Sequence, residues 1–392
     1  MTASKRFLTV GSLLRDPELL KYREKIEKRD DITYPFYDDF EGYAEVEDQA
    51  VQASVKKQIE LGLPEISDGE QARSLWHLDF AWGIEGIGRH IADQGYLFKD
   101  DQSDDADVFE TRRDIALTID GPLSGKNHPF VGHWKRVAEL AEGEEAVPKQ
   151  TIPALGHIYC ELLMADEVDK QEVYDSHDDF RQALVQAYQD FVKEYAEAGG
   201  RVLQMDDCIW SHFAESNDTE ILPFIENSPE GTVEGLAQAI VDLNNQVIDY
   251  AHDLGLRVYT HNCRGNYASR GAMTGTYSEV AKFFLEKQNY DRFYLEWDDD
   301  RAGSLEVLSV FKDRPDVEVV LGSLSSKLSS LDDTRRTLEM LEEASQYIPK
   351  ENLYLSHQCG FASCDVGNEL SEEQQWEKIK QGQEIARQFF GE

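Results

Sequence analysis

The sequence predicts an α/β fold, namely a (β/α)8 TIM barrel formed by one elaborated domain over residues 1–392. Short runs rich in β-branched and aromatic residues alternate with longer amphipathic stretches along the whole chain. Several of the short runs are almost continuously apolar, as expected for parallel strands that are buried on both faces. No low-complexity linker interrupts this alternation, so we expect one domain rather than two.

Nine segments are expected to form strands, one more than a barrel of this type contains. They are residues 7–12, 64–69, 114–120, 149–155, 201–206, 257–262, 292–297, 317–322 and 353–358. We expect the 114–120 segment to be the additional strand. Apolar residues recur every three or four positions in three stretches that we expect to be helices, which are 178–198, 233–254 and 332–347.

An open, doubly wound sheet is the alternative architecture. In that fold a Gly-x-Gly-x-x-Gly motif usually follows the first strand, and this chain has none there. The glycines of residues 83–88 have a different spacing and follow no predicted strand. No phosphate-binding loop of the Gly-Lys-Ser/Thr type is present either. The barrel therefore remains the preferred prediction.

The composition is strongly acidic, because 39 Lys and Arg stand against 77 Asp and Glu, giving a formal charge of −38. On average such a chain is repelled by nucleic acid and by anionic membranes, so neither is expected as a partner. No apolar run reaches the roughly 18–20 residues that a membrane span needs, and the first residues do not form a signal peptide. The acidic stretch 100–107 is expected to be a solvated loop.

The five cysteines are too few, and odd in number, for a disulfide framework. Free thiols of this kind are typical of a reducing compartment, so we expect a cytoplasmic protein. Such thiols can serve packing, metal binding or catalysis.

Residues that bind metals stand at the ends of three predicted strands. His261 and Cys263 end the 257–262 strand, Glu296 ends the next, and Cys359 follows the last. A barrel gathers the carboxyl ends of its strands at one mouth, and imidazole, thiolate and carboxylate together suit zinc. These four residues are therefore candidate zinc ligands. The competing interpretation is two cysteines that act as small buried apolar groups and a glutamate that forms an ordinary ion pair.

Three other predicted strands also end in polar residues. They are Ser12, Glu70 and Asp206. A carboxylate that is buried without a partner is costly, so the two acids are expected to meet a cation or a ligand. The alternative is that these side chains cap the helices that follow the strands.

Taken in order, these residues resemble the C-terminal catalytic barrel of cobalamin-independent methionine synthase. The matching segments span nearly the whole chain and are Thr9-Val10-Gly11-Ser12, Leu61-Gly62-Leu63, Asp68-Gly69-Glu70, Gln204-Met205-Asp206-Asp207, Thr260-His261-Asn262-Cys263, Leu295-Glu296 and Cys359-Gly360. The resemblance implies a (β/α)8 barrel with a catalytic zinc. It implies that the metal ligands are His261, Cys263, Glu296 and Cys359.

The resemblance also implies the reaction, which is methyl transfer to the thiol of homocysteine to give methionine. It suggests that Ser12, Glu70 and Asp206 hold the amino-acid part of homocysteine. An ammonium group calls for one of the two acids as its counter-charge. Glu296 is expected to be the exchangeable ligand, because catalytic zinc sites keep one such position.

This chain departs from the family in two respects. It has no duplicated N-terminal barrel. The family's Asp-Ile-His segment appears here as residues 320–327, which contain no histidine, so the acid that protonates a folate leaving group is missing. His357 is a candidate replacement, with a position behind the zinc ligands or in the core as alternatives. The methyl donor is therefore left open between methyl-tetrahydrofolate, a methylated corrinoid protein and a smaller methyl compound.

Other functions are ranked lower. A different thiol acceptor is the nearest alternative. A zinc hydrolase is less favoured, because two thiolates make zinc a weaker Lewis acid. A non-catalytic barrel with a structural zinc is the remaining class. A homo-oligomer is compatible with the sequence, which does not give the oligomeric state.

Overall fold

The computed structural model describes residues 4–25, 34–90, 97–99, 108–110, 116–164, 172–214, 222–271, 273 and 275–392. The loop expected at residues 100–107 therefore lies outside the described residues.

Six parallel strands form the central sheet, in the order β12–β11–β10–β9–β8–β7. They are β7 (Gln150–Pro153), β8 (Val202–Asp206), β9 (Arg257–Asn262), β10 (Arg292–Glu296), β11 (Glu318–Leu324) and β12 (Leu353–His357). Each strand lies beside its neighbour in sequence, with helical segments between them. Nearly all the residues of these strands are buried, which explains their continuous apolar runs. The structure confirms an α/β fold with a parallel sheet.

Two short segments lie next to the outer strands of this sheet. Phe7 forms a parallel bridge with Leu355 of β12. At the other side, β1 (Glu65–Ile66) pairs in parallel with β6 (Val147–Pro148), which directly precedes β7. The strands expected at 7–12 and 64–69 are thus present only as short pieces.

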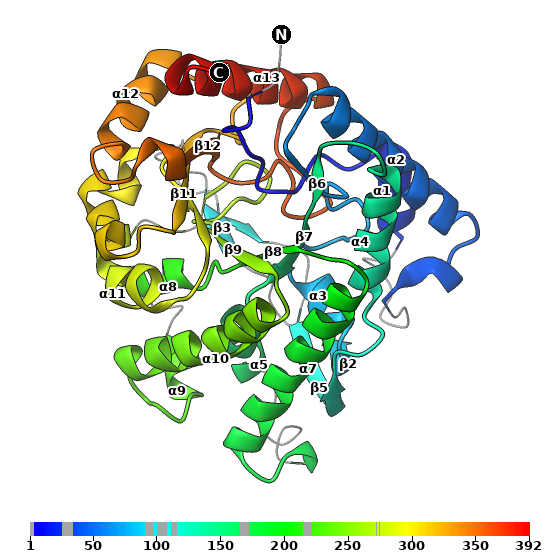
Figure 1. Cartoon of the computed structure of the whole chain (residues 1–392). Coiled ribbons are helices and arrows are strands. Elements are labelled where there is room, and N and C mark those ends of the chain that lie inside the picture. Colours follow the sequence, from blue (N-terminus) through cyan, green and yellow to red (C-terminus); the bar gives the residue numbers. More distant parts are fainter. Residues whose placement is uncertain are drawn as a thin grey trace.

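Helices surround the sheet (Figure 1). The long ones are α2 (Tyr43–Glu60), α7 (His177–Glu197), α10 (Val233–Asp253) and α13 (Glu372–Phe390). The shorter ones are α1 (Pro17–Arg23), α3 (Leu78–Trp82), α4 (Pro129–Leu140), α5 (Leu155–Leu163), α8 (Trp210–Ala214), α9 (Leu222–Glu226), α11 (Tyr277–Lys287) and α12 (Thr334–Ala344), with 3-10 turns η1 (Phe36–Asp38), η2 (Asp300–Ala302), η3 (Leu305–Asp313) and η4 (Lys350–Asn352). The three helices expected from periodicity correspond to α7, α10 and α12.

The helix starts agree with the local sequence. Ser176 caps α7 by accepting a hydrogen bond from the backbone N–H of Asp179. Thr232 caps α10 in the same way, through the N–H of Gly235. Such caps satisfy N–H groups that have no partner within the helix.

An antiparallel pair lies outside the parallel sheet. It consists of β2 (Glu85–His90) and β5 (Ala116–Ser124), so the prediction that the 114–120 segment is the additional strand is confirmed. Gly86 and Gly88 allow the two strands to approach closely. A Cβ atom on Gly86 would lie 2.5 Å from the carbonyl oxygen of Gly121. A second antiparallel pair is formed by β3 (Leu97–Lys99) and β4 (Val108–Glu110).

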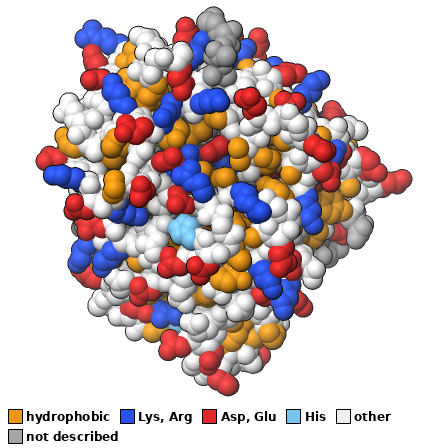
Figure 2. Space-filling model, in the orientation of Figure 1, with side chains coloured by type: hydrophobic (Ala, Val, Ile, Leu, Met, Phe, Trp, Pro, Cys, Tyr) orange, Lys and Arg blue, Asp and Glu red, His pale blue; other side chains and the backbone are white. Residues whose placement is uncertain are grey.

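Acidic and basic side chains are mixed over the face seen in Figure 2. The negative charge is therefore distributed on this face rather than gathered in one patch. Among the helices of the described residues, none has both the length and the apolar character that crossing a membrane requires.

Candidate metal and substrate site

Two thiols meet at the carboxyl end of the sheet. Cys263 follows β9, Cys359 follows β12, and their Sγ atoms are 3.6 Å apart. Both are buried. Hydrogen bonding to a neighbouring thiol and burial raise the pKa of both side chains well above the ordinary value. The thiols therefore stay protonated unless a cation lies between them, and such a cation would turn the pair into two adjacent thiolate ligands.

His261 lies in β9. Burial alone would lower the pKa of its imidazole, but interactions with Cys359 outweigh burial and raise it. Its Nε2 is 3.0 Å from the carbonyl oxygen of Gln358. A carbonyl only accepts hydrogen bonds, so Nε2 carries a hydrogen, and in the neutral ring Nδ1 keeps its lone pair. Metal-binding histidines typically donate their second N–H to a carbonyl or a carboxylate, so this orientation fits a ligand.

Glu296 ends β10 and is 1% exposed. Its Oε2 accepts a hydrogen bond of 2.8 Å from the backbone N–H of Arg264, which directly follows Cys263. Its Oε1 has no hydrogen-bond partner among the described residues, and the Nζ atom of Lys327 lies 3.7 Å away. A buried carboxylate oxygen with no hydrogen-bond donor is suited to a cation.

Two acids lie on the adjacent strand ends. Asp206 ends β8, accepts a hydrogen bond of 2.7 Å from Gln204, and lies 3.7 Å from His261 Nδ1. Burial, with a further contribution from the negative charge of Glu70, raises the pKa of Asp206 to about 8. Glu70 follows β1 and accepts a hydrogen bond of 3.1 Å from Thr151 through Oε1. Its Oε2 is buried and has no hydrogen-bond partner in the described part of the chain.

Ser12 lies against the segment that follows Cys359. Its Oγ accepts a hydrogen bond of 3.4 Å from the N–H of Ala362, and its carbonyl accepts one of 2.9 Å from Phe361. A Cβ atom on Gly360 would lie 1.8 Å from this Oγ. A glycine next to Cys359 therefore allows the two segments to pack together.

Comparisons with known proteins agree with this arrangement. The chain is 34% identical to YxjH of Bacillus subtilis (strain 168) over 381 residues, which cover 97% of this chain and 93% of that protein. It is 31% identical to YxjG of the same organism with the same coverage. Both relatives are named as uncharacterized proteins. No family model matches the chain.

The chain belongs to the same family as YxjH and YxjG. Among solved structures it is similar to a candidate vitamin-B12-independent methionine synthase of Listeria monocytogenes, over the full length of both chains, with 27% identity and a TM-score of 0.68. The B12-independent methionine synthase of Shewanella sp. W3-18-1, solved in complex with selenomethionine, shares the fold, with 18% identity over 98% of both chains and a TM-score of 0.65.

One residue predicted from the resemblance to methionine synthases lies in different surroundings. The ring of His357 packs edge-on against Phe7 and Phe361, at centroid distances of 5.7 and 4.9 Å. Burial lowers its pKa to about 3. The ring is therefore neutral near pH 7 and a weak acid. These surroundings agree with the alternative that placed His357 in the core, and its role as the acid stays a prediction.

Two residues that the sequence analysis did not assign lie next to the candidate metal ligands of this chain. Cys208 follows β8, and Cys263 is among the groups that influence the pKa of its thiol. Its position two residues after Asp206 was the signal that could have indicated it, because His261 and Cys263 have the same spacing. Lys327 is buried beside Glu296. A single lysine in a serine-rich segment gave no such signal.

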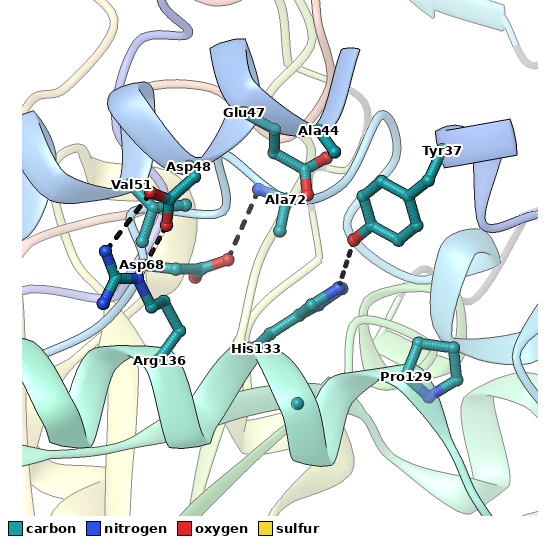
Figure 3. A pocket seen from close by; sticks show the side chains of 11 residues that line it. Tyr37, Ala44, Glu47, Asp48, Val51, Asp68, Ala72, Pro129, His133 and Arg136 are labelled. Carbon is teal, nitrogen blue, oxygen red and sulfur yellow. Dashed lines mark hydrogen bonds and ion pairs between the residues drawn. The ribbon is translucent and has the colours of Figure 1, made fainter. Parts of the chain in front are cut away.

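A cavity of about 310 Å³ lies apart from this cluster, between α2 and α4 (Figure 3). The Tyr37 hydroxyl and His133 Nε2 are 3.0 Å apart there, and Arg136 pairs with Asp48 at 2.6 Å. None of the sequence-predicted site residues lines it. The first contact joins η1 to α4 and the second joins α2 to α4. We assign the cavity no role in the reaction.

Proposed function

We propose that this chain is a zinc-dependent methyltransferase that methylates the thiol of homocysteine and so forms methionine. The observation that carries the proposal is the pair of buried thiols 3.6 Å apart, with the His261 imidazole interacting electrostatically with Cys359. The proposed zinc ligands are His261, Cys263, Glu296 and Cys359. The donor set fits zinc, because soft thiolates, a neutral imidazole and a carboxylate are its usual ligands.

When bound, zinc supplies a Lewis acid that stabilises the substrate sulfur as a thiolate at neutral pH. His261 would offer Nδ1, since Nε2–H is held by the Gln358 carbonyl. Glu296 is the ligand best suited to give way to the incoming thiol. The N–H of Arg264 and the ammonium of Lys327 already face its carboxylate and would stabilise its charge outside the metal shell.

The amino-acid part of homocysteine is proposed to lie against the adjacent strand ends. Glu70 offers a buried carboxylate oxygen with no hydrogen-bond donor, which suits an ammonium group. Asp206 lies next to both Glu70 and His261 and would adjoin the same group. The Ser12 hydroxyl is proposed to donate to the substrate carboxylate. These interactions would orient the thiol toward the thiolate pair.

We further propose that the parallel strands close into a (β/α)8 barrel. Phe7 bridges to β12 at one side of the six-stranded sheet, and β1 pairs with β6, which directly precedes β7 at the other side. The two pieces are also linked to each other, because Leu13 N–H donates to the carbonyl of Gly69 at 2.9 Å. Closure would bring all the proposed ligands to one mouth.

Methyl-tetrahydrofolate is the proposed donor, with a methylated corrinoid protein or a small methyl compound as the alternatives. Residues 320–327 contain no histidine, and Lys327 of that segment faces Glu296. None of the five cysteines forms a disulfide. A metal site with two thiolate ligands needs a reducing environment, so we propose a cytoplasmic location.

The test is metal content together with methyl transfer to homocysteine from each of the three donor classes. Cys359→Ser is expected to lose zinc and activity together. Cys364→Ser is the matched control, because that thiol is also buried but interacts with the backbone of Val366 and Gly367 instead. If Cys359→Ser kept its full metal content and activity, the proposed site would be wrong.

A further inference from the structure

A second group of ligand-type side chains lies near the ends of β1 and β7. His77 precedes α3, and His157 and Glu161 lie on α5. Each histidine Nε2 is 3.7 Å from Glu161 Oε1. One ligand atom from each of the three residues lies within 4.8 Å of the others. None of these residues belongs to the proposed methyl-transfer site.

The local structure explains how these side chains meet. His157 and Glu161 are four residues apart, so they project from the same face of α5. The indole ring of Trp76 lies 4.5 Å from the ring of His77 and 4.9 Å from that of His157. The two imidazole rings meet edge-on at 5.1 Å. Aromatic packing therefore holds both imidazoles in place.

The burial of His157 gives independent support for a ligand. The residue is 7% exposed, and neither of its ring nitrogens has a hydrogen-bond partner among the described residues. Leaving buried polar atoms without partners costs free energy, which a metal ion would offset.

We propose that His77, His157 and Glu161 bind a second divalent transition-metal ion, with zinc as the expected occupant. Two imidazoles and one carboxylate are a common ligand set for such ions, and water would complete the coordination. Donor atoms around tetrahedral zinc are about 3.3 Å apart. The two spacings of 3.7 Å between histidine and Glu161 thus need only a small closure, and the spacing between the two histidine nitrogens, which is within 4.8 Å, would have to shorten as well. The site would tie the segment after β1 to α5, independently of the proposed methyl-transfer site.

Metal analysis of the purified full chain tests this inference. The wild-type protein is expected to bind two zinc ions per chain. In His157→Asn the affinity of the histidine site should fall at least about tenfold, so that the purified variant retains one zinc ion. Glu161→Gln should lower the affinity in the same way, and it serves as the second variant if His157→Asn does not fold. His252→Asn changes a histidine that is a third exposed, and it should keep both ions.

Cobalt substitution separates this site from the thiolate site. In Cys359→Ser, added Co²⁺ should still give visible d–d absorption from the histidine site, without the near-ultraviolet band that thiolate ligands produce. The additional change His157→Asn should remove the remaining signal. The inference is overturned if wild type and His157→Asn bind the same amount of metal, or if Cys359→Ser binds no Co²⁺. Loss of methyl transfer in Cys359→Ser alone would concern only the proposed function.

Discussion

Glu70→Gln should weaken homocysteine binding by removing the counter-charge of the ammonium group. In the structure Glu70 Oε1 is held by Thr151, and Oε2 is buried with no hydrogen-bond partner among the described residues. The guanidinium groups of Arg15 and Arg73 each lie 3.8 Å from the carboxylate. Glutamine has the same size, so the change removes charge without opening a cavity.

The magnitude follows from the value of one hydrogen bond between charged groups. Such a bond contributes about 1.5–3 kcal/mol, which corresponds to a factor of about 12–160 in affinity. The two buried guanidiniums remain in the variant and would repel an ammonium, so we expect the upper half of this range. The ammonium group does not react, so KM should rise while kcat changes little.

The assay compares homocysteine with 4-mercaptobutanoate, which has the thiol and the carboxylate but no ammonium. Wild type should prefer homocysteine, and Glu70→Gln should lose most of that preference. Ser12→Ala is the control, because it should weaken both thiols alike. An unchanged KM for homocysteine, or an equal loss with both thiols in Glu70→Gln, would refute the assignment of Glu70.

The remaining predictions concern stability. Glu65→Leu should lower the free energy of unfolding by about 1.5–3 kcal/mol, because it removes one of the two carboxylates paired with buried Arg292, at 2.6 Å, and leaves only Glu318 at 2.7 Å; a loss below about 0.5 kcal/mol in equilibrium denaturation would contradict this. Phe293→Ala should cost about 3–5 kcal/mol, since the ring is fully buried; urea unfolding measures it, and a near-zero change would show that this part of the core repacks freely. The hydrogen bond to Asp291 raises the pKa of His252 above 6.5 in the folded protein. The stabilisation from this interaction is therefore complete at pH values below the pKa of His252 in the unfolded chain. It is lost as the pH rises through the pKa of His252 in the folded protein. His252→Gln should therefore reduce stability near pH 5 by less than about 1 kcal/mol and leave it unchanged near pH 9, and an equal loss at both pH values would exclude the charge as the cause.

The sequence was sufficient for the parallel sheet because buried parallel strands have a distinctive composition. The six predicted segments from 149–155 to 353–358 correspond to the six strands of the sheet. β2 was not predicted, because its glycines were considered only as a possible nucleotide-binding motif, whereas they permit close contact with β5. This requirement depends on the partner strand and cannot be read from one segment.

The candidate site was predictable in part, because the predicted strands also fix where their carboxyl ends lie. Cys263 and Cys359 follow two such strand ends and meet there, although they are far apart in sequence. The surroundings of His357 could not be predicted from strand geometry, because β12 ends there and the backbone is no longer extended at Cys359. Cys208 was left unassigned because its neighbour Cys263 lies on another strand.

The pairing of β1 with β6 has a consequence for how relatives of this protein diverge. Glu65 lies beside Val147, so the intervening chain leaves the sheet and returns to it at neighbouring positions. That chain carries β2, β5 and His77. Its length can therefore change without shifting the register of any other strand. We expect members of the family to differ most in this excursion, and to acquire new ligand contacts there while the thiolate pair stays fixed.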